Sequence, residues 1–206
     1  MIESKDEQFV LQPLGLIEIG LHEGDIMQRK YAGVGSRQTP VSILQLMEAT
    51  AKAASSKDWF CCTGGAKGAD QAFMRGAEPD KLIVYPPWKT YEEAERPQGC
   101  HVVLNGFDTV RARELVLELH PNPSALTRGP MAMHMRNVHI VLGSRLDRPV
   151  EFVLCWTPGG KVQGGTGMAI RTADLFSIPV INMATEGWQG KVGAIISQPT
   201  VQLKLL

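Results

Sequence analysis

The sequence predicts a single α/β domain with a doubly wound, mainly parallel sheet. Two observations lead to this fold class: strand-like and helix-like segments alternate along the chain, and glycine-rich turns connect several of them. Alternation of this kind is the pattern of parallel strands joined by helical crossovers. A chain of 206 residues, 44% hydrophobic and 20% charged, suits one hydrophobic core and is short for two ordinary domains.

The expected elements follow one another in order. Short apolar runs predict strands at residues 30–34, 59–63, 81–85, 151–156 and 179–183. Apolar residues at helical spacing predict helices at residues 40–55, 68–77, 109–119, 130–142, 166–176 and 188–196. Together they define a domain over residues 30–206. Residues 1–29 are expected to form a peripheral segment, in which the alternating run 14–21 suits a hairpin.

The stretch at about residues 88–130 interrupts this rhythm. It is rich in proline and glycine around the helix at 109–119, so we interpret it as an insert that forms an elaborated crossover or a lid.

Composition and charge argue against several functional classes. Lys and Arg together number 21, as do Asp and Glu, so the net charge of zero gives no electrostatic footprint for nucleic acid. The four cysteines and five histidines lack zinc-type spacing, so no metal is expected, and the cysteine usage points to a reducing compartment. With no signal-peptide pattern and no run of membrane-spanning length, we expect a cytoplasmic protein without a membrane partner.

Three glycine-rich turns form the candidate ligand site, at residues 33–37, 64–70 and 164–167. Glycine lets backbone N–H groups approach a ligand, and a helix start adds unpaired donors and the positive end of a dipole. Strand-to-helix turns of a doubly wound sheet lie at the carboxyl ends of the strands, so the three turns should converge on one crevice. The leading ligand class is therefore a phosphate-bearing small molecule, in particular a nucleotide.

Polar side chains beside the turns strengthen this interpretation. Hydroxyl and cationic groups that can contact phosphate oxygens are present at Ser36, Arg37, Lys67, Thr166 and Arg171. Arg37 is the strongest candidate, because a cation directly after a glycine turn has little structural use. Asp70 can accept from a ribose or base, or can simply complement a helix N-terminus. The pair Arg136-Asn137 either bridges a helix to the sheet or reaches into the crevice.

The ordered set of motifs resembles a known family. It consists of Gly33-x-Gly35-Ser36-Arg37, Thr63-Gly64-Gly65-Ala66-Lys67-Gly68-Ala69-Asp70, Arg136-Asn137, and Gly164-Gly165-Thr166-Gly167 with Ala169. This set, over about residues 30–185, resembles the Rossmann-like core of the DprA/Smf DNA-processing proteins. It is similar more broadly to the SLOG superfamily, which also includes the LOG phosphoribohydrolases and nucleotide-sensing domains of bacterial defence systems. Short, stand-alone DprA-like phage proteins are especially similar.

The resemblance implies a Rossmann-like domain that binds its ligand on the glycine turns. Combined with the residue-level argument, it gives this candidate ligand-binding set: Gly33, Gly35, Ser36, Arg37, Gly64, Gly65, Lys67, Gly68, Asp70, Arg136, Asn137, Gly164, Gly165, Thr166, Gly167 and Arg171. No cofactor is expected and no catalytic residue is assigned. Because related folds often pair through crossover helices, we expect a homodimer or higher homo-oligomer.

Three functions are compatible with these features. The favoured one is a binding protein for a nucleotide or nucleotide-derived molecule, for example an ADP-ribose-type signal that a phage counter-defence factor senses or sequesters in the host cytoplasm. The second is a LOG-like nucleoside 5′-monophosphate N-glycosidase. That family's signature glutamate is absent, since Ile170 occupies the expected position, so Glu151, Glu114 or Asp70 would have to replace it.

The third function is DprA-like binding of single-stranded DNA by an oligomer. Trp88 and Tyr91 in the insert are the aromatic residues suited to base stacking. DNA is the less favoured partner, because the net charge is zero and the chain has no room for the extra helical domains that DNA-processing proteins usually carry.

Overall fold

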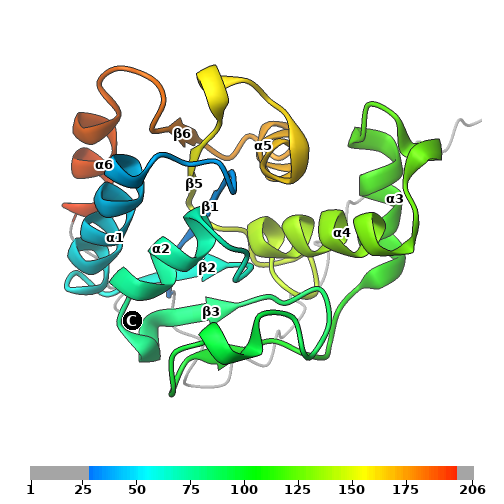
Figure 1. Cartoon of the computed structure of the whole chain (residues 1–206), viewed down its shortest axis with the longest axis horizontal. Helices are drawn as coiled ribbons and strands as arrows, with labels where there is room; N and C mark the ends of the chain where they lie inside the picture. The colour runs from blue at the N-terminus through cyan, green and yellow to red at the C-terminus, as the bar shows by residue number, and fades with distance from the viewer. Residues whose placement is uncertain (1–27, 199–206) are drawn as a thin grey trace, which may run out of the picture.

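A six-stranded sheet runs through the part of the chain that the computed structural model describes, residues 28–198 (Figure 1). Its strands are β1 (Arg29–Gly35), β2 (Trp59–Thr63), β3 (Leu82–Val84), β4 (His101–Val102), β5 (Phe152–Trp156) and β6 (Val180–Asn182). All neighbouring pairs are parallel, in the order β4-β3-β2-β1-β5-β6. The order therefore reverses between β1 and β5, which confirms the doubly wound α/β fold predicted from the sequence.

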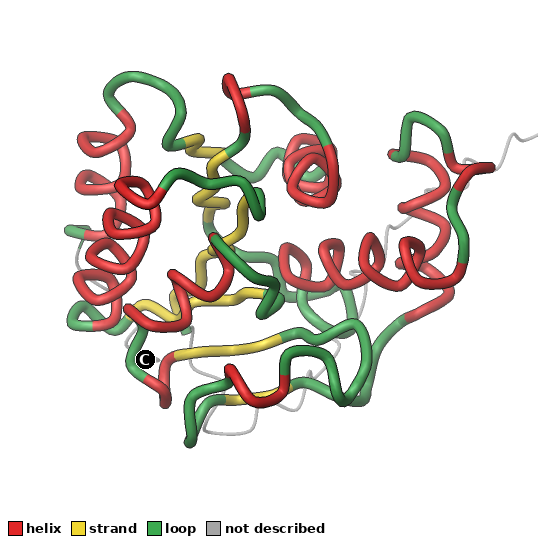
Figure 2. The backbone as a smooth tube through the Cα atoms, viewed as in Figure 1, coloured by secondary structure: helices red, strands yellow, loops and turns green. Residues whose placement is uncertain are grey.

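Helices cover both faces of this sheet (Figures 1 and 2). The six α-helices of the described chain are α1 (Val41–Ser55), α2 (Ala69–Gly76), α3 (Thr109–Leu119), α4 (Arg128–Leu142), α5 (Gly164–Leu175) and α6 (Trp188–Ile196). One core cluster joins the sheet to α1, α2 and α6, and a second joins it to α3, α4 and α5. Each face of the sheet thus has its own apolar layer.

Strand β5 shows why the central strands are continuous apolar runs in the sequence. Phe152 and Leu154 belong to the core cluster on the α1 side, whereas Val153 and Cys155 belong to the cluster on the α4 side. Side chains alternate along a strand, so a strand buried on both faces needs apolar residues at every position. On the α1 side, Phe152 stacks on Tyr31 with ring centroids 5.4 Å apart.

The insert carries the chain from β3 towards α4 and β5 through loops, one short strand and helix α3. It contributes a short edge strand, β4, which pairs with β3 and which the sequence did not indicate. Helix α3 begins and ends as predicted, and its residues Ala112, Leu115 and Val116 are fully buried in the second core cluster. The insert thus contributes these three buried residues to the core, and its other residues are half-buried or exposed. The hairpin expected at 14–21 lies outside the described residues, and the division at residue 30 stays a prediction.

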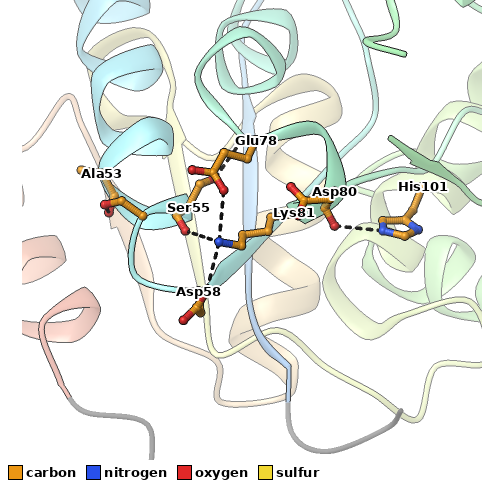
Figure 3. A network of polar contacts seen from close by, with 8 residues as sticks. Ala53, Ser55, Asp58, Glu78, Asp80, Lys81 and His101 are labelled. Atoms are coloured by element: carbon orange, nitrogen blue, oxygen red, sulfur yellow. Dashed lines mark hydrogen bonds and ion pairs between the residues drawn. The ribbon is translucent and has the colours of Figure 1, made fainter. Parts of the chain in front are cut away.

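A polar network fixes the amino-terminal end of β3, at the edge of the sheet away from the glycine turns (Figure 3). Lys81 Nζ lies 3.0 Å from Asp58 Oδ1 and 3.1 Å from Glu78 Oε2, and donates to the Ser55 carbonyl oxygen at 2.9 Å. The Asp58 and Glu78 carboxylates raise the pKa of Lys81, and the contact with Ser55 ties the end of α1 to the start of β3. The network therefore stabilises the end of the sheet that lies opposite the glycine turns.

Candidate functional site

The three glycine-rich turns follow β1, β2 and β5, so all lie at the carboxyl edge of the sheet, as predicted. A cleft of about 500 Å³ opens there, at the switch point between β1 and β5. Its walls come from all three turns, helix α4 and Tyr91 of the insert, and the second turn contributes Ala66 and Asp70. This volume lies within the range of roughly 300–1,000 Å³ that is usual for small-molecule sites.

The structure separates the candidate ligand-binding residues into two groups. Those that line the cleft are Gly35, Ser36, Arg37, Asp70, Arg136, Asn137, Gly164, Gly165 and Thr166. Those that do not line it are Gly33, Gly64, Gly65, Lys67, Gly68, Gly167 and Arg171. Several of the second group have packing roles instead. A Cβ on Gly33, for example, would lie 2.6 Å from the Phe73 ring, so this glycine allows α2 to approach β1.

Ser36 shapes the first turn. Its backbone N–H donates to the Trp156 carbonyl oxygen at 3.1 Å, and its Oγ accepts from the Gln38 N–H at 3.0 Å. The turn is thereby fixed against the end of β5. Arg37, next in sequence, is exposed and makes no hydrogen bond or ion pair with residues 28–198, so its guanidinium is available to a ligand.

The third turn presents the uncapped N-terminus of α5 to the cleft. No side chain caps this helix, and its first intrahelical bond runs from the Gly167 N–H to the Gln163 carbonyl oxygen at 2.9 Å. The N–H groups of residues 164–166 precede that bond, so they lack helical partners at the positive end of the dipole. Gly164 has φ +62° with open space around it, which suits a turn that exposes backbone donors. This is the geometry of an anion site.

Arg136 and Asp70 form a buried ion pair at one wall of the cleft. Both side chains are 5% exposed, and Arg136 Nη1 lies 3.3 Å from Asp70 Oδ2. The same Oδ2 accepts from the Ala66 N–H at 3.2 Å. Burial raises the pKa of Asp70, and the Arg136 guanidinium opposes that rise. A Cβ on Gly64 would overlap the Arg136 guanidinium, so Gly64 makes room for this pair.

Asn137 holds the third turn. Its Nδ2 donates to the Gly165 carbonyl oxygen at 2.8 Å. Consecutive residues of α4 therefore fasten two different turns, Arg136 the one after β2 and Asn137 the one after β5, while both line the cleft. The two roles weighed from the sequence, bridging and lining, are thus combined.

The cleft is also lined by residues outside the candidate ligand-binding set, among them the ring side chains of Tyr91 and His134. The Arg136 guanidinium lies 6.0 Å from the Tyr91 ring centroid, and the Trp88 ring meets Tyr91 at 5.1 Å and 83°. His134 precedes Asn137 by three residues on α4, and this spacing is the signal that places both on one side of the helix. Burial, and then His120 and two arginines, lower the pKa of His134 to about 4.

The carboxylates proposed as catalytic replacements are differently placed. Glu151 directly precedes β5, at the edge of the sheet opposite the glycine turns, and pairs with Arg29 at 3.3 Å. Glu114 is exposed on α3 and pairs with Arg111 at 2.9 Å. Of the residues that line the cleft, Asp70 alone carries a carboxylate, and its Oδ2 already accepts from Ala66 and Arg136.

Within residues 28–198, no three His, Cys, Asp or Glu residues come together as a metal site. No helix in this range combines the length and the hydropathy that crossing a bilayer requires.

The comparisons with known proteins support the fold. No family model matches the sequence, and no curated protein matches it. A solved structure does match: DNA processing protein A from Helicobacter pylori, a protein described by its single-stranded DNA binding mode. The match has a TM-score of 0.52 and 16% identity, and covers 85% of this chain and 76% of that one. At this identity the likeness establishes that the two chains share a Rossmann-like α/β fold.

Proposed function

We propose that the cleft binds a nucleotide or a nucleotide-derived small molecule through its phosphate. The observation that carries the proposal is the uncapped N-terminus of α5, which opens into the same cleft as Arg37. Unpaired backbone donors, a helix dipole and a free guanidinium all favour an anion at this place.

The remaining walls suit the rest of a nucleotide. Tyr91 offers an aromatic face at the cleft, and the neighbouring Trp88 is 47% exposed. Aromatic faces stack on bases of any sequence. We therefore assign the phosphate to the α5 end of the cleft and the base to the side formed by the insert.

We propose further that the ligand is bound without being cleaved. Glycosidic cleavage needs a carboxylate or similar group that activates water or stabilises the developing cation. Asp70 is buried and engaged by internal donors, and Glu114 and Glu151 lie elsewhere. Retention of an intact ligand is what a sensor or sequestering protein for a signalling nucleotide, such as an ADP-ribose derivative, requires.

Single-stranded DNA is the second candidate ligand. The likeness to a DNA processing protein favours it, and the exposed Trp88 beside the cleft is suited to a further base. The same phosphate site would then hold one nucleotide of the strand.

Calorimetric titration distinguishes the two candidates. The full chain is titrated at low and at high salt with adenosine 5′-monophosphate, ADP-ribose and a 15-nucleotide oligothymidylate, and the Gly165→Val variant serves as the blocked control. Saturable binding of a mononucleotide that the variant loses supports the small-molecule function. Binding of the oligonucleotide alone, weakening with salt, favours DNA. Absence of binding by all three contradicts both.

A further inference from the structure

A second cavity lies beside α4, away from the glycine turns. Its volume is about 410 Å³. Its wall is mainly apolar and combines the segment after β3, the loop before α3 and the start of α4, through Pro86, Pro87, Phe107, Leu126, Met131 and Met135. In Figure 1, α4 crosses the middle of the view, with α5 above it and β3 below it.

The second cavity and the cleft lie on different faces of α4. Met131, Ala132, Met135 and His139 line the second cavity, and their spacing of three and four residues places them on one helical face. The cleft is lined from another face of the helix, which includes Met133 and Asn137. Arg136 lies between these faces and borders both hollows. The second cavity is therefore separate from the proposed nucleotide site.

A buried histidine without a full set of partners borders this cavity. His139 is 3% exposed, and its Nδ1 lies 3.2 Å from the Gly143 carbonyl oxygen. A carbonyl oxygen only accepts, so Nδ1 donates, and Nε2 of the neutral ring is left as an acceptor. Nε2 is buried and has no partner within the described chain. Burial also lowers the pKa of this ring, which keeps it neutral.

Cationic side chains at the cavity wall favour a ligand that also carries a negative charge. Arg113 on α3 and Arg128 at the start of α4 both line the cavity and are exposed. Neither guanidinium group forms a hydrogen bond or ion pair within residues 28–198. An apolar hollow with unpaired guanidinium groups complements a molecule that has an apolar body and an anionic end.

We propose that this cavity is a second binding site, for a small planar ring compound that carries an anionic group and an N–H or O–H donor. The ring lies against Phe107 and the methionines, the donor meets Nε2 of His139 after a small side-chain adjustment, and the anionic group lies near Arg113 and Arg128. The inference rests on this cavity alone and holds whether or not the cleft binds a nucleotide.

The test uses 8-anilino-1-naphthalenesulfonate, which has aromatic rings, an N–H group and a sulfonate. Its fluorescence is titrated with the native full chain under conditions where the near-ultraviolet circular dichroism shows intact packing. We expect saturable binding of one probe molecule per chain. Ala132→Phe fills the cavity and should abolish it, whereas Ala194→Phe, at an exposed position on α6, should leave it unchanged.

A second pair of variants tests the charge. Arg113→Gln combined with Arg128→Gln should weaken probe binding at least fivefold. Arg111→Gln is the control, because Arg111 is also an exposed arginine of α3 but lies outside the cavity wall, and it should leave probe binding unchanged. If Ala132→Phe fails to fold, this double variant decides. Probe affinity that is unchanged by both, or native protein that shows no saturable binding, overturns the proposal. Gly165→Val should leave probe binding intact, which separates this site from the cleft.

Discussion

At the scale of single residues, glycines in similar sequence motifs have different structural roles. Gly33 and Gly64 make room for the side chains of Phe73 and Arg136 and do not line the cleft, whereas Gly164 and Gly165 present backbone at its surface. Residue type and spacing indicated that the turns converge. They did not indicate which glycines face the ligand, because that depends on side chains that arrive from α2 and α4.

Arg37 provides the sharpest test at this scale. Arg37→Ala should weaken nucleotide binding by about 2–3 kcal/mol, roughly 30- to 150-fold, because a charge-assisted contact to phosphate is lost. The melting temperature should stay nearly unchanged, since Arg37 is exposed and unpaired in the described chain. Calorimetry on the purified variant measures both the affinity and, with a thermal scan, the stability.

Lys67→Ala is the matched control for this experiment. Lys67 is also an exposed cation in a glycine turn, but it lies outside the cleft wall, so its removal should change affinity by less than about 0.5 kcal/mol. Equal losses in the two variants would show that long-range charge, rather than a contact from Arg37, attracts the ligand.

At the scale of elements, the sequence predicted most of the fold. The predicted bounds are correct for the helices at 109–119 and 188–196 and for the strand at 59–63, because apolar patterns mark them and Asp108 caps the first of these helices. Strand β4 was missed, since two residues with exposed and half-buried side chains carry no periodic signal. The start of α5 at Gly164 was placed two residues late, because glycines are poor helix formers and only tertiary contacts recruit them.

Helix α4 acts as a brace between two turns, and this role gives the second prediction. Asn137→Ala removes the donor to the Gly165 carbonyl oxygen, so the start of α5 should loosen and nucleotide affinity should fall about tenfold.

Gly165→Val should abolish binding while the chain stays folded, because its side chain would stand in the anion site and the nearest atom, Asn137 Nδ2, is at 3.2 Å. Affinity and melting temperature of each variant are compared with the parent.

Gly190→Val, on the exposed surface of α6 with no atom near its Cβ, controls for the effect of a branched residue in a helix. If Gly165→Val binds as tightly as the parent, the α5 N-terminus is only a bend and the proposed phosphate site is wrong.

At the scale of the whole molecule, two histidines with lowered pKa values link stability to pH. Burial lowers the pKa of His134 from 6.5 to about 4, so its ring stays neutral in the folded chain while the unfolded chain takes up a proton. The resulting stabilisation is complete above pH 6.5 and is lost as the pH falls towards 4. His139 shifts in the same direction. Acid should therefore destabilise the fold in this window.

His134→Gln tests this linkage. The variant should lose less stability than the parent between pH 7 and pH 4.5, because one of the groups that bind protons preferentially in the unfolded state is gone. Denaturant midpoints at the two pH values give the comparison, and His101→Gln, at an exposed position remote from the cleft, is the control. Identical acid losses in the parent and His134→Gln would contradict the assignment of a depressed pKa to His134.

We expect the cleft to retain a bound ligand without cleaving it. The cleft combines an anion site with an aromatic wall but offers no free carboxylate, since Asp70 is enclosed with Arg136 and Ala66. Nucleoside monophosphates incubated with excess protein should therefore be recovered intact after heat denaturation, as judged by chromatography. Release of free base would contradict the binding function, and its loss in Asp70→Asn, checked for folding, would identify Asp70 as the group that acts. Because Asp70 also holds the turn at Ala66, Arg136→Gln is the companion variant, which disturbs the same ion pair but leaves the carboxylate in place. Cleavage that persists in Arg136→Gln would show that the Asp70 carboxylate takes part in the reaction and does not act only by holding the turn.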